Sequence, residues 1–168
     1  RAIGADLETG KTVIMTHGDL PLAMRASMSV SGVFPPVPYE NYLLVDGGIV
    51  KNMGIDEGRK LCGDVVIAVN VSSPTTNRKK LESLFAVSEQ TINIAVQKDM
   101  QAQIATLNSQ DVLITPEMGQ LTSTDFKESA QLIAAGEKAA RQNLAKLQRY
   151  TLSVEDYQKW QQTVQARK

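Results

Sequence analysis

The sequence predicts an α/β fold built around a three-layer, doubly wound and mostly parallel sheet. Short apolar runs of strand length alternate with longer segments that have helical periodicity, as in folds whose strands are joined by covering helices. The run at 64–71, DVVIAVNV, is almost continuously apolar, which is typical of a strand buried on both faces. Between the strand at 43–45 and this run lie enough residues for a right-handed parallel crossover.

The first elements are predicted to be a hairpin and a helix. Residues 2–8 and 11–16 have the composition of strands, and Thr9-Gly10 between them suits a tight turn. Residues 18–28, GDLPLAMRASM, favour a helix with Asp19 as the N-cap and Pro21 in the first turn.

The central part of the chain is predicted to contain a loop, a strand and a short helix. Residues 30–41, VSGVFPPVPYEN, hold three prolines and a glycine, which indicates a loop. The strand YLLVD follows at 42–46. Residues 54–63 favour a short helix closed by Gly63.

The second half is predicted to be mainly helical. Residues 81–108 and 125–149 each favour one long helix with an apolar stripe, and DVLITPE between them reads as a strand. A last helix is expected at 153–165, with Ser153 as the N-cap in a Ser-x-x-Asp arrangement close to a capping box.

Composition excludes several kinds of site and partner. Eighteen basic residues balance eighteen acidic ones, so no net field favours nucleic acid. One cysteine and one histidine exclude an internal disulfide and any site that needs two histidines. We expect no metal site and no cofactor. No apolar run approaches the roughly 20 residues of a membrane span.

The chain starts inside a predicted strand, RAIGAD, from which we expect a fragment of a longer domain.

Asp46 is the candidate functional residue, because it stands at the carboxyl end of a predicted strand and before two glycines. Ligands of open α/β sheets bind at this edge. Gly47 and Gly48 suit a sharp turn with positive φ, or a close backbone approach. A structural alternative stays open, in which Asp46 only caps the turn or the following helix.

No residue of the chain can be identified as the nucleophile that Asp46 would serve. No serine stands in a Gly-x-Ser-x-Gly elbow, and no glycine run resembles an oxyanion loop. The serines Ser27, Ser29 and Ser31 follow a predicted helix and read as hydrogen-bonding groups of its end and of the loop. His17 reads as a surface turn residue. A Ser-His-Asp triad therefore cannot be assembled from these residues.

Four segments in order and spacing resemble the second half of bacterial patatin-like phospholipases. They are ADLETGK at 5–11, GDLPLAMRASMSVSGVFPPV at 18–37, LLVDGGIVKNMGID at 43–56 and DVVIAVNVS at 64–72. DFKESAQLIAAGEKAAR at 125–141 resembles the closing helix of the same domain. The resemblance makes residues 1–150 the C-terminal part of a patatin-like hydrolase domain, without its N-terminal half. Residues 151–168 are then a terminal helix, or a connector as in outer-membrane patatin-like proteins.

The resemblance implies a lipid acyl hydrolase that acts on phospholipid or lysophospholipid esters with a serine–aspartate dyad. It identifies Asp46 as the dyad aspartate, supported by Gly47 and Gly48, and it leaves open whether metal ions help the reaction. The serine elbow and the oxyanion loop belong to the missing half, so this chain alone is expected to be inactive. Two positions depart from the family pattern, Ser31 and Gly54, which stand where relatives commonly carry proline.

A non-enzymatic binding or assembly subunit on the same scaffold is the alternative. In the first case, that of a hydrolase domain without its N-terminal half, the incomplete domain is expected to leave a sheet edge exposed, and so to self-associate. The compartment stays open: bacterial cytoplasm, or periplasm and outer membrane if the tail is a connector.

Overall fold

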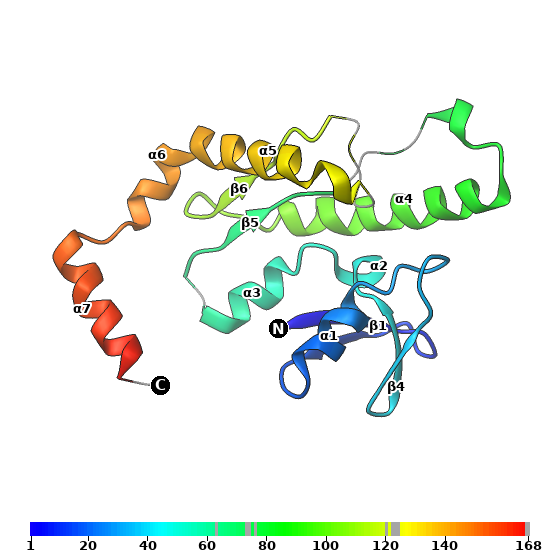
Figure 1. The fold of residues 1–168 in the computed structure, drawn as a ribbon, viewed down its shortest axis with the longest axis horizontal. Helices are drawn as coiled ribbons and strands as arrows, with labels where there is room; N and C mark the ends of the chain where they lie inside the picture. The colour runs from blue at the N-terminus through cyan, green and yellow to red at the C-terminus, as the bar shows by residue number, and fades with distance from the viewer. Residues whose placement is uncertain (63, 73–74, 76, 120, 122–124, 167–168) are drawn as a thin grey trace. The chain divides into compact units, whose positions relative to one another are not determined.

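The computed structural model describes residues 1–168 except 63, 73–74, 76, 120, 122–124 and 167–168. The chain divides into two compact units, Arg1–Leu113 and Ile114–Lys168. In the first unit and up to its boundary the elements are β1 (Ala2–Asp6), β2 (Thr12–Met15), α1 (Leu20–Ser27), β3 (Val37–Tyr39), β4 (Tyr42–Asp46), α2 (Gly48–Lys51), α3 (Ile55–Cys62), β5 (Ile67–Val69), the 3₁₀ turn Arg78–Lys80, α4 (Leu84–Ile104) and β6 (Val112–Ile114) (Figure 1).

The main sheet has four strands in the order β2-β1-β4-β3, and every pairing in it is antiparallel. The predicted mostly parallel sheet is therefore wrong for this part of the chain. Tight turns join β1 to β2 and β3 to β4, and strands joined in this way must run in opposite directions. The expected parallel crossover from β4 to β5 is also wrong, because β5 pairs with β6 in a separate two-stranded sheet.

The core of the first unit lies between this sheet and α1. Apolar side chains from one face of the sheet pack against the small side chains of α1: Met15, Val37, Tyr39, Leu44, Ala23 and Ala26. In Figure 1, α1 lies against β1 and β4, in agreement with its contacts. Small residues let the helix approach the strands closely, which places the segment after α1 beside the end of β4.

The first hairpin and the first helix agree with the sequence prediction. Gly10 has φ 68° in the turn between β1 and β2, and its N–H donates to the Asp6 carbonyl at 2.8 Å. Asp19 stands at the N-cap of α1 with a proline in the first turn, although its side chain accepts no capping hydrogen bond.

Two predictions in the middle of the chain are wrong. The proline-rich segment contains strand β3, whose Pro38 is tolerated because β3 is an edge strand of the sheet. The apolar run after residue 64 gives a strand of three residues, and its outer residues Ile67 and Val69 are 51% and 50% exposed. This strand is therefore not buried on both faces. The predicted closure of α3 at Gly63 lies outside the described residues.

The second half is helical as predicted, with different boundaries. Helix α4 begins at Leu84 because Ser83 caps it, the Ser83 hydroxyl accepting from the Ala86 N–H at 3.1 Å. The single helix predicted at 125–149 is divided at Asn143. The second unit contains the 3₁₀ turn Phe126–Glu128, α5 (Ser129–Gln142), α6 (Leu144–Leu147), the 3₁₀ turn Gln148–Tyr150 and α7 (Val154–Gln165). Ser153 caps α7 as predicted, its hydroxyl accepting from the Asp156 N–H at 3.1 Å.

Candidate active site

Asp46 is the last residue of β4, as the sequence predicted, and its backbone is held from two sides. It lies opposite Gly4 of β1 in the sheet register. Its N–H donates to the Ser29 carbonyl at 3.0 Å. Because side chains alternate along a strand, Asp46 shares the face of Leu44, which α1 covers. The carboxylate is thus placed by the sheet and by the segment that follows α1.

The Asp46 carboxylate is half-buried and is only partly satisfied. Its Oδ1 accepts from the Gly48 N–H at 2.7 Å, and its Oδ2 accepts no hydrogen bond from any described residue. Burial raises the pKa of this carboxyl above its ordinary value, and the Gly48 N–H opposes that rise in part. A carboxylate with a raised pKa and a free oxygen is suited to take up a proton.

The two glycines after Asp46 allow close approaches, and neither takes the positive φ that was considered for them. Gly47 has φ −68° and ψ −16°. A Cβ at Gly47 would stand 2.3 Å from the carbonyl oxygen of Ile3, so only glycine fits there. A Cβ at Gly48 would stand 2.9 Å from Oδ1 of Asn52 and 3.1 Å from Oδ1 of Asp46. Bare backbone at these positions lets the chain turn directly under the carboxylate.

The backbone conformation of Gly54 accounts for one departure from the pattern that the resemblance implies. Its φ is +61°, in the left-handed region that glycine adopts readily. Proline is locked near −65°, so the proline that the resemblance leads one to expect here could not replace Gly54 in this conformation.

Ser29 is a structural residue that the sequence reading did not distinguish from its neighbours. It is fully buried. Its hydroxyl donates to the Arg25 carbonyl at 2.7 Å and accepts from Arg25 Nη1 at 2.5 Å. Arg25 also lies over the Phe34 ring, 4.8 Å from its centroid, and Nη2 donates to the Pro35 carbonyl at 3.4 Å. Ser29 and Arg25 together hold the loop that accepts the Asp46 N–H.

The remaining candidates from the sequence stand apart from the Asp46 carboxylate. His17 is mainly exposed, and its Nδ1 lies 4.0 Å from Glu40. Ser31 is exposed as well. No hydrogen bond joins the Asp46 carboxylate to a serine or a histidine in the part of the chain that the structure describes.

Asp6, in the ADLETGK segment, holds the strands beside the site together. Its Oδ2 accepts from the Thr9 hydroxyl at 2.6 Å, and its Oδ1 accepts from the Leu43 N–H at 3.3 Å. The Thr9 hydrogen bond is the main reason that the pKa of Asp6 lies below its usual value. Asp6 thus fixes the β1–β2 turn to β4.

Two side chains of α4 belong to the surroundings of the site and had no clear signal in the sequence. Gln103 is buried, and its Oε1 accepts from the Ile55 N–H at 2.9 Å. Asp99 accepts from the Asn52 N–H at 3.1 Å. The two residues stand four positions apart on a helix. This spacing is common among polar residues, so it did not indicate that these side chains bind the backbone of another element.

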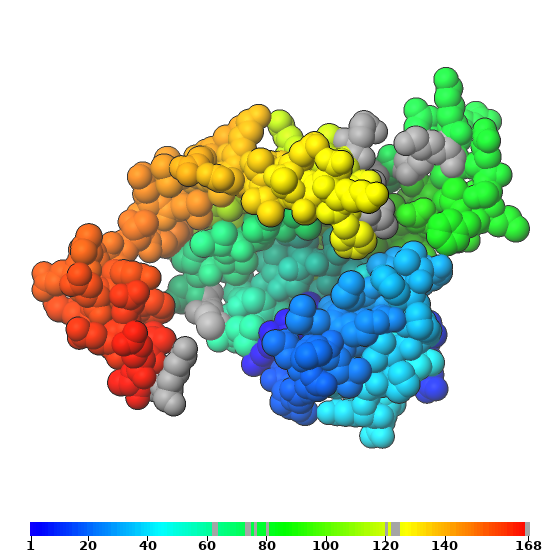
Figure 2. Space-filling view, viewed as in Figure 1, coloured from blue at the N-terminus to red at the C-terminus, as the bar shows by residue number. Residues whose placement is uncertain are grey.

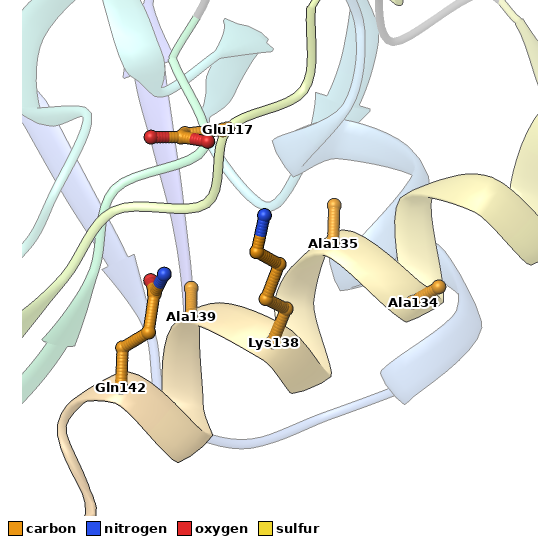
Figure 3. A pocket seen from close by; sticks show the side chains of 6 residues that line it. All are labelled: Glu117, Ala134, Ala135, Lys138, Ala139 and Gln142. Atoms are coloured by element: carbon orange, nitrogen blue, oxygen red, sulfur yellow. The ribbon is translucent and has the colours of Figure 1, made fainter.

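A pocket of about 200 Å³ lies within the second unit (Figure 3). It is lined by Glu117, Ala134, Ala135, Lys138, Ala139 and Gln142. In Figure 3 the Lys138 side chain extends from α5 toward Glu117. None of the residues that hold Asp46 lines this pocket.

The described residues contain no group of three or more His, Cys, Asp or Glu side chains placed to hold a metal ion. Within the same described ranges, no helix is long and apolar enough to cross a membrane.

Comparison with known proteins finds similarity over the part of the chain that contains these features. Residues 5–58 match the family model described as patatin-like phospholipase. The chain is similar to patatin-like phospholipase domain-containing protein 7 of Mus musculus, with 40% identity over 74 residues, which are 43% of this chain and 6% of the relative. It is also similar to an uncharacterized NTE family protein of Mycobacterium tuberculosis, with 27% identity over 163 residues, which are 83% of this chain and 28% of the relative.

A fungal relative carries an activity in its name. The lysophospholipase NTE1 of Pyricularia oryzae is 26% identical over 164 residues, which are 84% of this chain and 11% of the relative. The chain therefore spans less than a third of the length of these curated relatives. The part of the chain that matches the patatin-like phospholipase family model, residues 5–58, contains Asp46, Gly47 and Gly48.

Proposed function

We propose that this chain supplies the aspartate of a serine–aspartate dyad in a lipid acyl hydrolase of the phospholipase or lysophospholipase class. The observation that carries the proposal is the Asp46 carboxylate, which has a raised pKa, one oxygen held by Gly48 and the other without a hydrogen bond among the described residues. The family match over residues 5–58 and the lysophospholipase relatives support the substrate class.

The chemistry follows from the position of this carboxylate. Asp46 takes the proton of a serine hydroxyl as the serine oxygen attacks the ester carbonyl. The protonated Asp46 then gives that proton to the departing alkoxide, and an acyl-enzyme remains. In the second half of the reaction Asp46 takes a proton from the water that attacks the acyl carbonyl. It then returns this proton to the serine oxygen as the bond to the acyl group breaks, which releases the fatty acid and restores the serine hydroxyl.

We further propose that the serine lies outside these 168 residues, in an N-terminal half with an elbow and an oxyanion loop, and that the chain alone is inactive. The absence of a Gly-x-Ser-x-Gly sequence supports this, as does the structural role of Ser29. In this proposal residues 1–150 are the C-terminal part of the hydrolase domain, and 151–168 are a terminal helix or a connector.

A fluorophosphonate probe, which labels activated serines, tests the proposal through intact mass. We expect no label on the 168-residue chain and one label on the product of the whole coding sequence. In that product, Asp46→Asn should reduce ester hydrolysis by roughly 10²- to 10⁴-fold, the range for loss of a general acid–base group. Asp19→Asn is the matched control, because the Asp19 side chain makes no capping hydrogen bond.

Two outcomes would contradict the proposal in different ways. A label on the 168-residue chain would mean that one of its own serines is the nucleophile. A folded product of the whole coding sequence that takes no label and hydrolyses no ester would favour the non-enzymatic subunit instead.

A further inference from the structure

Helix α4 carries a hydrogen-bonded pair of side chains that reaches the backbone behind Asp46. The Gln103 Nε2 donates to Asp99 Oδ2 at 2.7 Å, and the same Asp99 oxygen accepts from the Asn52 N–H. The Gln103 Oε1 accepts from the Ile55 N–H, in a fully buried hydrogen bond. The two side chains therefore hold both ends of the bend between α2 and α3.

This bend is connected directly to the candidate carboxylate. Asn52 ends α2, and its Oδ1 occupies the space beside the Cα of Gly48, where a Cβ would stand 2.9 Å away. Gly48 begins α2 and gives Asp46 Oδ1 its hydrogen bond. In Figure 1, α2 lies beside α4, in agreement with their contacts. Gly48 and Asn52 thus stand at the two ends of one short helical turn, and through this turn we expect a displacement of Asn52 to reach the Gly48 N–H.

We propose that Asp99 and Gln103 are positioning residues, which hold α2 so that the Gly48 N–H stays on the Asp46 carboxylate. This inference rests on the proposed function for its catalytic meaning. Neither side chain is expected to touch the substrate. Their effect reaches Asp46 through Asn52 and Gly48.

Because Gln103 donates and Asp99 accepts, the proposal can be tested by exchanging the donor and the acceptor between the two positions. In Gln103→Glu, two carboxylates would face each other across the present 2.7 Å contact, and their repulsion should release the bend. In Asp99→Asn alone, the new amide oxygen can still accept from both donors, so the change should be small. In the Asp99→Asn/Gln103→Glu double variant, the asparagine has to turn about χ2, because a single Asp99 oxygen accepts from both Gln103 and the Asn52 N–H in the wild type. After that turn its amide donates to the new glutamate, its oxygen accepts from the Asn52 N–H, and the glutamate accepts from the Ile55 N–H.

The first readout is nuclear magnetic resonance of the 168-residue chain. We expect Gln103→Glu to raise the pKa of the Asp46 carboxyl and to shift the Gly48 amide proton upfield, because the hydrogen bond between them weakens. The double variant should restore both signals. Gln101→Glu, the same chemical change at an exposed position of α4, controls for the added charge.

The second readout is the activity of the product of the whole coding sequence. Gln103→Glu should lower kcat by roughly 100-fold, the scale expected for a displaced catalytic group, with KM little changed. The double variant should regain most of this loss. Such a return would not follow if Gln103 only filled space in the interior.

The proposal is overturned if Gln103→Glu leaves the Gly48 and Asp46 signals as they are in Gln101→Glu. It is also overturned if the double variant is as perturbed as Gln103→Glu. Should Gln103→Glu fail to fold, a folded double variant with wild-type signals supports the proposal, and an unfolded or perturbed one contradicts it. Absence of esterase activity in the unsubstituted protein would refute the proposed function, while the resonance measurements would still decide the role of α4.

Discussion

The pKa values of two aspartates in the first unit are shifted in opposite directions by their surroundings. Burial raises the pKa of Asp46. Asp111, by contrast, accepts from Arg59 Nη2 at 2.6 Å, from the Val66 N–H at 2.9 Å and from the Asn108 N–H at 2.8 Å. Arg59 is the main cause that lowers the pKa of Asp111 to about 2. The charge of Asp111 stabilises the fold, whereas the charge of Asp46 costs stability.

Replacing these two carboxylates should therefore have opposite effects on the free energy of unfolding. Asp111→Asn should lose about 1–3 kcal/mol at neutral pH, because donors arranged for a charged acceptor lose it. Asp46→Asn should lose nothing, or gain slightly. Urea unfolding of the 168-residue chain at pH 7 measures both, with the exposed Asp64→Asn as a control. Equal losses in the first two variants would contradict this assignment of roles.

The stability that the Asp111 carboxylate contributes should decrease as the pH falls. Asp111 has a folded pKa of about 2 against an ordinary value of 3.8. Its contribution is thus fully present above about pH 4 and is lost as the pH falls toward 2. The difference in stability between the wild type and Asp111→Asn should shrink over the same interval.

Sequence reasoning located Asp46 because its signal is local: an apolar run, an acid and two glycines. Ser29 was correctly interpreted as a hydrogen-bonding residue at the end of a helix, but its burial and its link to Asp46 could not be found in this way, and neither could the role of Gln103. Their roles depend on partners at Arg25, Asp46 and Ile55, and Gln103 lies 48 residues from Ile55. A buried polar residue is recognised by its surroundings, and these are set by the tertiary fold.

At the scale of elements, Gly47 provides a test of the backbone turn under Asp46, and two glycines within helices serve as controls. Gly47→Ala should lose more than about 2 kcal/mol, because its Cβ would overlap the Ile3 carbonyl. Gly58→Ala in α3 and Gly136→Ala in α5 meet no atom within 4 Å, and each should gain about 0.5–1 kcal/mol. Urea midpoints separate these outcomes. A Gly47→Ala variant as stable as the wild type would mean that Gly47 does not approach Ile3.

Caps and turns were predicted from the sequence more accurately than strand partners, and the difference has a physical reason. Caps and tight turns are encoded by a few adjacent residues, so Ser153 and Thr9-Gly10 were identified correctly. Strand partners are not encoded locally. The run at 64–71 has the composition of a buried parallel strand, yet β5 pairs with β6 rather than β4. Pro38 likewise indicates a loop until β3 is known to be an edge strand.

At the scale of the whole molecule, exposed apolar surface and unpaired strand edges favour self-association. Leu20 and Met24 of α1 are 65% and 57% exposed, and α1 lies at the surface in the space-filling view (Figure 2). Strand β2 forms one edge of the main sheet. The opposite edge, β3, contains Pro38, which has no N–H to offer a further strand.

We therefore expect the 168-residue chain to associate through the edge of β2. Light scattering at micromolar concentration should give a mass above the 18.3 kDa of one chain. Ile14→Lys places a charge on that edge and should reduce the mass, since edge charges oppose strand pairing. Leu20→Lys adds the same charge on α1, and it should have less effect. A monomer in the wild type contradicts the prediction, and a stronger effect of Leu20→Lys would transfer the interface to α1.

The hydrogen bonds from α4 to the bend between α2 and α3 also affect the order in which the surroundings of Asp46 form during folding. Asn52 and Asp99 are 47 residues apart, and Ile55 and Gln103 are 48 apart. The hairpin of β1 and β2, by contrast, closes over a few residues. Because distant contacts carry a larger closure entropy, the hairpin can form early, while the α2–α3 bend closes only when α4 docks. On this argument the Gly48 N–H reaches the Asp46 carboxylate late in folding, and under the proposed function partial opening at α4 would lower activity while the sheet stays intact.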